Sequence, residues 1–436
     1  MSGATDTLPA GPRRPAVIQG MQFVRDEFGL LADCRERYGN VFTLRMWPFG
    51  PLVVVAEPPL VKEIYTGDTS TLYAGKANAT LEPIIGSRSL MVLEEGEHLQ
   101  QRRLLLPPLH SERMRAYGEV MRDVVDAEID SWPLGTPFEM HGSMLAAALR
   151  VITRTVFGIE ETARMQEIEA LMHRVMRLGE PVTMISLLRR DLGPFSPWAR
   201  FCRAREELDQ VIFEEIRDRR ATESWRERED VLSLLLGARY EDGREMTERE
   251  IRDELVTLLV TGHATSASTL SWAVERLTRS PEPYARLKRS VAEGDDAYLE
   301  NVVKEVMRIR PVVSFAVRGL NKPLDLNGWH LPPGITVGTS IYLMHTREDL
   351  YPDPEAFRPE RFDDPSTETY TNITFGGGVR RCIGAAFAHY EAKIMLRRIF
   401  ERCDLSAPDR EPEPDGRQLV AHVPGKGARV VLDARD

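Results

Sequence analysis

Hydrophobic and polar positions follow a helical period over most of the chain between about residues 95 and 310. Within this region, the run 247–280 contains no proline and opens with Thr247 and Glu250, a spacing typical of a capping box. Its middle, residues 255–260, is apolar on almost all sides. A helix that is apolar all round has to cross the interior of a protein. The pattern therefore predicts one long buried helix within a mainly helical region.

Short β-type segments lie on both sides of this region. The runs Val41–Met46 and Leu52–Val55 are expected to form two strands, because a proline- and glycine-containing turn joins them. The first 20 residues are rich in proline and glycine and are expected to lie along the surface.

Beyond residue 310 the pattern changes to short strands and proline-broken loops, followed by one more helix. The expected segments are a helix over Ala385–Phe400, a charged loop over Ala407–Gly416 and a tail with β character over Arg417–Leu432. No interdomain linker and no internal repeat is visible. We therefore expect a mainly α fold with small β-sheets, in a single domain spanning residues 1–436.

Charge and cysteine content restrict the function. A net charge of -10 argues against nucleic acid as the main partner, which requires a basic surface. The four cysteines form no CxxC pair, and the absence of an HExxH motif makes a zinc site improbable. Few cysteines, no signal-peptide pattern and no long apolar run predict a cytoplasmic monomer without a membrane anchor. The charge runs Arg217–Arg220 and Arg226–Asp230 are expected to be solvated helix faces.

The most informative segment is the loop FGGGVRRCIG at 375–384. Consecutive glycines at 376–378 allow backbone angles that other residues rarely adopt. Cys382 lies just before the predicted helix at 385–400, where the helix dipole and nearby arginines favour the thiolate form. Such a thiolate can act as a nucleophile or as a metal ligand.

The surroundings of Cys382 favour a metal ligand over a nucleophile. A catalytic cysteine needs a base, and the nearest histidine in sequence, His389, lies beyond the loop. A haem thiolate needs a glycine-lined backbone, a cation for a propionate and an apolar cover, which Arg380 and Phe375 supply. Thiolate ligation of haem iron favours cleavage of the O–O bond.

This segment resembles the haem-binding signature of the cytochromes P-450, FxxGxRxCxG. The matching positions are Phe375, Gly378, Arg380, Cys382 and Gly384. The resemblance extends over nearly the whole chain, from the LPAGP segment to the last strands. It implies the family's fold, with haem b bound through the Cys382 sulfur between the long helix at 247–280 and the helix after the cysteine loop.

Other matches support the resemblance. Glu305 and Arg308 are three residues apart, share a helix face and can form an ion pair. In the family, this pair and the arginine of FRPERF, here Arg361, form a buried network that braces the cysteine loop. Three more residues resemble haem-propionate ligands: His98, Arg102 and Arg318.

The segment TGHAT at 261–265 resembles the family's oxygen-binding motif, [AG]Gx[DE]T, at Gly262 and Thr265. The family's threonine assists proton delivery during oxygen activation, and the acid before it feeds that relay. Ala264 replaces the acid, so Thr261, four residues earlier on the same face, is a candidate for a second hydroxyl. A mid-helix glycine costs about 1 kcal/mol relative to alanine. Close approach of a cofactor and tight helix packing are both reasons for Gly262.

The resemblance implies a monooxygenase that inserts one atom of O2 into a hydrophobic small molecule, such as a terpenoid, steroid, fatty acid or macrolide. Electrons would come from NAD(P)H through a separate ferredoxin or flavodoxin with its reductase, since no flavin or iron–sulfur pattern is visible. By analogy, the substrate pocket is lined by Ile84, Ile85, Leu90, Met184, Ile185, Ala264, Val312, Val313, Phe315 and Val423.

Two alternatives stay open at this point. The first is a peroxide-driven oxygenase or an isomerase of the same fold, which Ala264 alone favours. The second is a haem-binding sensor or carrier without enzymatic activity. Turnover with peroxide or with NADPH separates the first alternative from a monooxygenase, and a search for any turnover tests the second.

Overall fold

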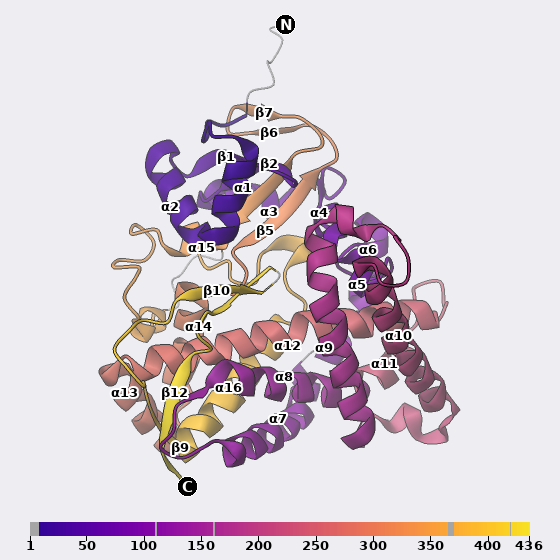
Figure 1. Ribbon diagram of the computed structural model, residues 1–436, viewed down its shortest axis with the longest axis vertical. Helices are drawn as coiled ribbons and strands as arrows, with labels where there is room; N and C mark the ends of the chain where they lie inside the picture. The colour runs from indigo at the N-terminus through magenta and orange to yellow at the C-terminus, as the bar shows by residue number, and fades with distance from the viewer. Residues whose placement is uncertain (1–7, 110, 160–161, 365–369, 419) are drawn as a thin grey trace, which may run out of the picture. The chain divides into compact units, whose positions relative to one another are not determined.

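The computed structural model describes residues 8–109, 111–159, 162–364, 370–418 and 420–436. These residues are mainly helical with small β-sheets, as the sequence pattern predicts. The chain divides into two compact units. Unit 1 comprises Met1–Ala77 and Lys304–Cys382, and unit 2 comprises Asn78–Val303 and Ile383–Asp436. Figure 1 shows the helices and strands of both units along the chain.

A five-stranded sheet forms the centre of unit 1. Its order is β1 (Val41–Met46), β2 (Gly50–Val55), β8 (Thr336–Ser340), β5 (Phe315–Leu320) and β3 (Leu72–Tyr73). The first predicted strand is confirmed, and the second begins earlier than predicted because Gly50 still pairs with Met46. β2 runs parallel to β8, whereas the other neighbours are antiparallel. Buried valine and leucine side chains of these strands form the core of the unit.

The helices of unit 1 pack around this sheet. They are α1 (Ala16–Arg25), α2 (Glu27–Tyr38), α3 (Pro58–Thr66), α15 (Ile341–His345) and the end of α14 (Ala297–Ile309), with a β6–β7 hairpin (Leu324–Leu326, Trp329–Leu331). α1 begins within the proline- and glycine-rich segment that was expected only to lie along the surface. Buried Gln19 explains the difference, because its amide donates to the Pro12 and Arg14 carbonyls and accepts from Arg45 N at 3.0 Å.

The predicted long helix of unit 2 is α12 (Glu248–Thr278), and it crosses that unit (Figure 1). The capping box is confirmed: Glu250 N donates to Thr247 Oγ1 at 3.2 Å, and Thr247 N donates to the Glu250 carboxylate at 2.8 Å. α12 packs against α8 (Met140–Phe157) and α16 (Ala385–Arg402), and α16 packs against α7 (Ser111–Ser131).

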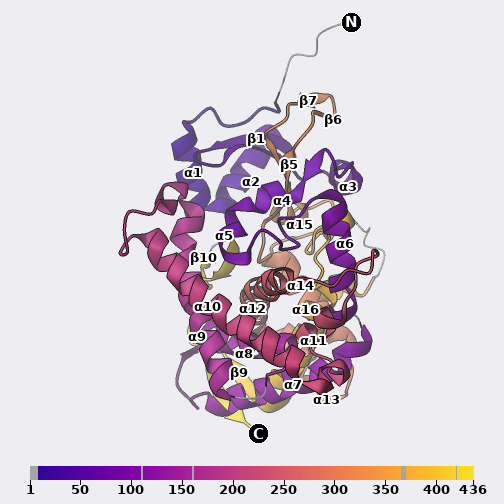
Figure 2. The same ribbon diagram turned by 90° about the vertical axis from the view of Figure 1, so that its right-hand side faces the viewer.

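The remaining helices of unit 2 lie around these. α9 (Thr162–Met184) and α10 (Pro197–Ala221) pack along each other, as both views show (Figure 2). The others are α5 (Glu82–Ile85), α6 (Glu95–Leu105), the 3-10 turn η3 (Ser186–Arg189), α11 (Val231–Gly237) and α13 (Pro281–Ala292); α4 (Ala74–Asn78) spans the unit boundary. Two sheets complete it: β4 (Phe138–Glu139) with β12 (Arg429–Arg435) and β9 (Cys403–Ser406), and β10 (Asp415–Gln418) with β11 (Ala421–Pro424).

Two local expectations need correction in unit 2. The predicted loop at 407–416 ends early, because Asp415 already pairs with Pro424 in the β10–β11 hairpin. The charge runs are not wholly solvated either. Arg219 is buried and donates to Asp230 at 2.6 Å and to Glu215 at 2.8 Å, so these charges compensate one another inside the fold.

Candidate functional site

The loop that carries Cys382 is closed by its own backbone. Cys382 N donates to the Phe375 carbonyl at 2.9 Å, and Arg381 N donates to the Gly378 carbonyl at 3.1 Å. These bonds bring the two ends of the loop together three residues before α16 begins at Ala385. The Cys382 residue is exposed in this arrangement.

The glycines of the loop are required by a neighbour within unit 1. A Cβ at Gly377 would overlap the ring of Tyr65, and a Cβ at Gly378 would overlap the Tyr65 carbonyl oxygen. Gly378 also has a φ of +65°, which side chains other than glycine rarely adopt. Tyr65 is held in place because its hydroxyl lies 2.7 Å from the Thr339 hydroxyl. The sequence pattern alone indicates cofactor approach as the reason for the glycines, and no local signal marks Tyr65.

Cys382 differs from the other cysteines in its accessibility. Burial raises the pKa of both Cys34 and Cys403 to about 11, and burial also raises the pKa of Cys202. Only Cys382 is exposed among the four, and it follows two arginines. A thiol must be deprotonated to ligate a metal, so this position suits ligation best.

The donor set fits haem better than a bare metal ion. The described residues contain no group of three or more His, Cys, Asp or Glu side chains that could hold a metal ion. Haem brings four nitrogen ligands of its own and needs only one ligand from the protein, which a thiolate can be. Cys382 would supply that thiolate, and Arg380 lies in the same loop to pair with a propionate.

The predicted Glu305–Arg308 pair lies in the interior of unit 1, where both side chains are 0% exposed. Arg308 donates from Nε and Nη2 to the two carboxylate oxygens of Glu305, at 2.7 and 2.8 Å. The Arg358 backbone N–H and Arg361 Nε donate to the same carboxylate, at 2.9 and 3.2 Å. The carboxylate therefore has four donors, as a buried charge requires.

A chain of hydrogen bonds links this network to the cysteine loop through His345. Arg308 Nη1 donates to the His345 carbonyl at 2.8 Å. The imidazole Nε2 of His345 accepts from Ile373 N at 3.1 Å, and the Ile373 carbonyl accepts from Gly376 N at 2.8 Å. Because Nε2 is an acceptor, His345 has to be neutral. The sequence analysis missed this residue, because its partners come from distant parts of the chain.

His345 gives the network a dependence on pH. Burial, and then the charge of Arg308, lowers the pKa of His345 to about 3. The unfolded chain takes up this proton below a pKa of about 6.5. The stabilisation from neutral His345 is therefore complete above about pH 6.5 and is lost as the pH falls toward the folded-state value.

Acidification from pH 7 to pH 5 should lower the free energy of unfolding of the natural protein by about 2 kcal/mol more than that of the His345→Gln variant. Glutamine keeps a hydrogen-bond acceptor but does not titrate. Urea unfolding at the two pH values measures the difference, and other titrating groups cancel between the proteins. Equal losses would show that His345 does not couple protonation to stability.

The threonines of the oxygen-binding motif lie on α12 in unit 2. Thr265 Oγ1 donates to the Thr261 carbonyl and Thr261 Oγ1 donates to the Thr257 carbonyl, both at 2.7 Å. Each hydroxyl proton is thus engaged by the helix itself, and each oxygen remains an acceptor. The two hydroxyls do not bond each other directly, so a shared relay needs water between them.

Gly262 has a packing role in this structure. A Cβ at this position would lie 2.9 Å from Ile152 Cδ1 on α8, so glycine lets the two helices approach. Of the two reasons that the sequence leaves open, the structure supplies helix packing. His263 is buried and its Nδ1 lies 2.7 Å from the Leu259 carbonyl. Ala264 is partly buried and presents no acid.

A buried carboxyl lies next to the motif and was missed by the sequence analysis. Glu391 on α16 accepts from Ser266 Oγ at 2.5 Å, and Ser266 directly follows Thr265. Burial raises the pKa of Glu391 to about 8, so the side chain is a neutral acid at pH 7. The available signal was a charged residue on the apolar face of an amphipathic helix.

The residues expected to hold the propionates lie on separate elements. Buried His98 and partly buried Arg102 are on α6, and buried Arg318 is on β5 with its guanidinium carbon 5.9 Å from the centre of the Tyr65 ring. Glu254 of α12 positions α6, because its carboxyl accepts from Gln101 Nε2 at 3.0 Å. The role of His98, Arg102 and Arg318 toward haem stays a prediction.

The residues expected to line the substrate pocket have different surroundings. Ile84 and Ile85 are wholly buried, and Ile84 packs over Gly179 of α9, so here they belong to the core of unit 2. Leu90 and Val423 are buried, Ile185 and Val313 are exposed, and Ala264, Val312 and Phe315 are partly buried. The side chain of Met184 lies outside the described residues. The pocket as a whole stays a prediction.

Comparison with known proteins identifies the family. The family model "Cytochrome P-450" matches residues 9–428 and so spans both units. Relatives named putative cytochrome P-450 135B1, from Mycobacterium bovis and Mycobacterium tuberculosis, are 39% identical over 441 residues, covering 100% of this chain and 93% of theirs. The putative cytochrome P-450 138 of Mycobacterium tuberculosis is 35% identical, with 98% of this chain and 97% of the relative covered.

Solved structures show the same fold. The structure titled "Retinoic acid bound cyanobacterial CYP120A1" matches with a TM-score of 0.85 at 22% identity, covering 98% of this chain and 100% of that one. No helix among the described residues has the length and apolar character needed to cross a membrane. The motif, the fold and the full-length relatives agree, so the chain belongs to the cytochrome P-450 family of haem monooxygenases.

Proposed function

We propose that this protein binds haem b through Cys382 and inserts one atom of O2 into a hydrophobic small molecule. Electrons come from NAD(P)H through a separate ferredoxin or flavodoxin and its reductase. The two units act as one P-450 domain, in agreement with the single family model that spans both. The observation that carries the proposal is the exposed Cys382 in a closed loop, tied to the buried Glu305–Arg308 pair.

The bound haem would supply oxygen activation, and residues of this chain would supply protons. Thr265 presents a partly buried hydroxyl on α12. Ser266 is the next residue in the chain, and its hydroxyl donates to Glu391, which is a buried neutral acid. An acid whose pKa lies near the working pH both gives and regains a proton readily. Glu391 therefore takes the place of the acid that Ala264 lacks.

This assignment predicts that NADPH consumption becomes uncoupled from product formation in two variants. Thr265→Ala and Glu391→Gln should each lower product formed per NADPH consumed by about tenfold or more, while hydrogen peroxide released rises. Substrate binding, read by the spin-state shift of the haem spectrum, should change little. Thr261→Val added to Thr265→Ala should uncouple further if water joins the two hydroxyls.

The control for Glu391→Gln is Glu401→Gln, which removes a carboxyl from the same helix where it is half-exposed. Its coupling should equal that of the natural protein. Unchanged coupling in both Thr265→Ala and Glu391→Gln would mean that protons arrive by another path.

Ala264 favours one alternative, a peroxide-driven oxygenase or isomerase of the same fold. Such an enzyme does not need proton delivery from the protein during oxygen activation. The Ser266–Glu391 pair speaks for the oxygen-dependent reaction, because it holds a buried acid on the residue that follows Thr265. Product formed with NADPH, ferredoxin and reductase under O2 supports our proposal, whereas product formed only with added peroxide supports the alternative.

The substrate class is tested by a binding screen. Terpenoids, steroids, fatty acids and macrolides are added to the haem-loaded protein, and the shift of the haem spectrum is recorded for each. We expect a saturable shift with an apolar compound and none with polar molecules of similar size. A shift by polar compounds alone would contradict the hydrophobic pocket.

A further inference from the structure

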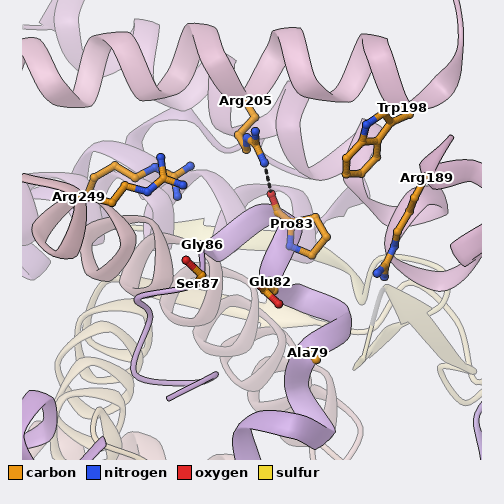
Figure 3. A pocket seen from close by; sticks show the side chains of 10 residues that line it. Ala79, Glu82, Pro83, Gly86, Ser87, Arg189, Trp198, Arg205 and Arg249 are labelled. Atoms are coloured by element: carbon orange, nitrogen blue, oxygen red, sulfur yellow. Dashed lines mark hydrogen bonds between the residues drawn. The ribbon is translucent and has the colours of Figure 1, made fainter. Parts of the chain in front are cut away.

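A pocket of about 210 Å3 lies wholly within unit 2 and is rich in arginine (Figure 3). The start of α12, α5, η3 and α10 contribute to its wall. Four guanidinium side chains line it, from Arg189, Arg205, Arg249 and Arg252, together with Trp198 and one acid, Glu82. So many arginines around one small pocket need either internal acids or an outside anion to balance them.

Two of the arginines are balanced from within. Arg252 is fully buried and donates to Asp209 from Nε at 2.6 Å and to Asp253 from Nη1 at 2.8 Å. Arg249 pairs with the same Asp253 carboxylate at 3.3 Å. This cluster fixes the first turns of α12 and consumes both aspartates.

The other two arginines are held by neutral groups. Arg189 donates from Nε to the Val182 carbonyl at 2.8 Å and from Nη2 to the Thr183 carbonyl at 3.0 Å. Arg205 donates from Nη1 to the Pro83 carbonyl at 3.2 Å, and its Nε is buried without an acceptor in the described part of the chain (Figure 3). Carbonyl groups orient a guanidinium but leave its charge uncompensated. Between described residues, neither arginine forms an ion pair.

The arrangement of the guanidinium donors suits a carboxylate. A guanidinium presents a planar fork of donors that matches the two oxygens of a carboxylate. Arg205 keeps such a fork at Nε and Nη2, and Arg189 keeps Nη1, because its Nε and Nη2 donate to backbone carbonyls. Glu82 is the single acid among the residues that line the pocket, and it is exposed. The pocket therefore retains an excess of positive charge after its internal ion pairs are formed.

Apolar surface next to the pocket indicates the rest of the ligand. Trp198 lines the wall and packs against Phe201, with ring centroids 5.7 Å apart. The segment that joins Arg189 to Trp198 exposes Leu192 and Phe195, which are 79% and 88% exposed. Large exposed apolar side chains on a segment that runs between two residues of a cationic pocket fit a molecule with one acidic end and one apolar end.

We propose that this pocket is a binding site for the carboxylate of an amphipathic free acid, with Arg189 and Arg205 as its ligands. The apolar part of the acid lies against Trp198 and the segment that follows Arg189. None of the residues that line the pocket is among those expected to hold haem, and its ligand binding does not depend on oxygen chemistry.

The test compares decanoate with 1-decanol on the haem-loaded, full-length protein by calorimetry. The double variant R189Q/R205Q keeps hydrogen-bond donors for the carbonyls but removes both charges. Decanoate should bind about tenfold or more weakly to it than to the natural protein, while 1-decanol binds equally to both. The matched control is R190Q/R203Q, which removes two exposed charges from the same segments and should change decanoate affinity less than about twofold.

Three results would overturn the proposal. The first is decanoate affinity that the double variant leaves unchanged. The second is equal loss in the control, which would indicate general electrostatic attraction. The third is binding to phosphatidylglycerol vesicles that depends on Arg189 and Arg205 when binding of free decanoate does not, which would assign the pocket to a lipid headgroup.

Discussion

Cys382→Ala is expected to abolish the red-shifted Soret band that we expect from the reduced natural protein under carbon monoxide, together with all measurable monooxygenase activity. The band requires a thiolate on the haem iron. Cys34 and Cys403 cannot substitute, because both are buried with pKa values of about 11. Absorption spectra of the reduced, carbon-monoxide-treated protein give the result directly, and far-UV circular dichroism shows whether the fold is kept.

Two further variants sharpen this test. Cys202→Ala removes a half-buried thiol from α10 and should leave band and activity unchanged. Cys382→His should move the band to the position typical of histidine ligation, because imidazole is the other common haem ligand. A thiolate-type band that survives in Cys382→Ala would disprove the assignment of the ligand.

Arg308→Ala is expected to destabilise the protein by about 3–5 kcal/mol, because it strands the Glu305 carboxylate in the interior. That loss is a large part of the ~5–15 kcal/mol that stabilises a typical domain. Arg308 also holds the His345 carbonyl, so the path to the cysteine loop is broken at the same time. We expect little folded protein and weak haem retention. Chemical unfolding and the haem-to-protein absorbance ratio measure the two effects.

The matched control is Glu167→Ala, since Arg164 and Glu167 form an ion pair with the same three-residue spacing near the surface. Exposed pairs contribute about 0.2–1 kcal/mol, so this variant should unfold almost like the natural protein. Glu305→Gln separates charge from shape, because the amide fills the same space without neutralising Arg308. If Arg308→Ala retained haem and unfolded like Glu167→Ala, the pair would not brace the loop.

Much of the fold could be predicted because its signals are local. The strand at 41–46 follows from a short β-rich run and the turn after it, and the long helix follows from the Thr247–Glu250 capping box and the apolar run after it. The signal of the cysteine loop is also local, since its cysteine, arginine and glycines lie within ten consecutive residues. The Glu305–Arg308 pair could be predicted because a helix places residues three apart on one face.

Residues whose role depends on long-range contacts could not be predicted in this way. The role of Tyr65 depends on its packing against the glycine run, and Gly377 of that run lies 312 residues later in the chain. Glu391 becomes a neutral acid only because α16 buries it against Ser266, and Arg219 becomes buried only because Asp230 folds back onto it. Burial sets the protonation state and the partners of a charged side chain, and burial is a property of packed elements.

The chain thus encodes its family, its proposed cysteine ligand and its main elements in patterns that lie within a few helical turns or one loop. The reason for each glycine, the neutrality of His345 and Glu391, and the uncompensated charge of Arg189 and Arg205 arise only when distant segments pack. The free energy of burying a polar or charged group depends on the atoms that surround it, and residues adjacent in sequence supply few of those atoms.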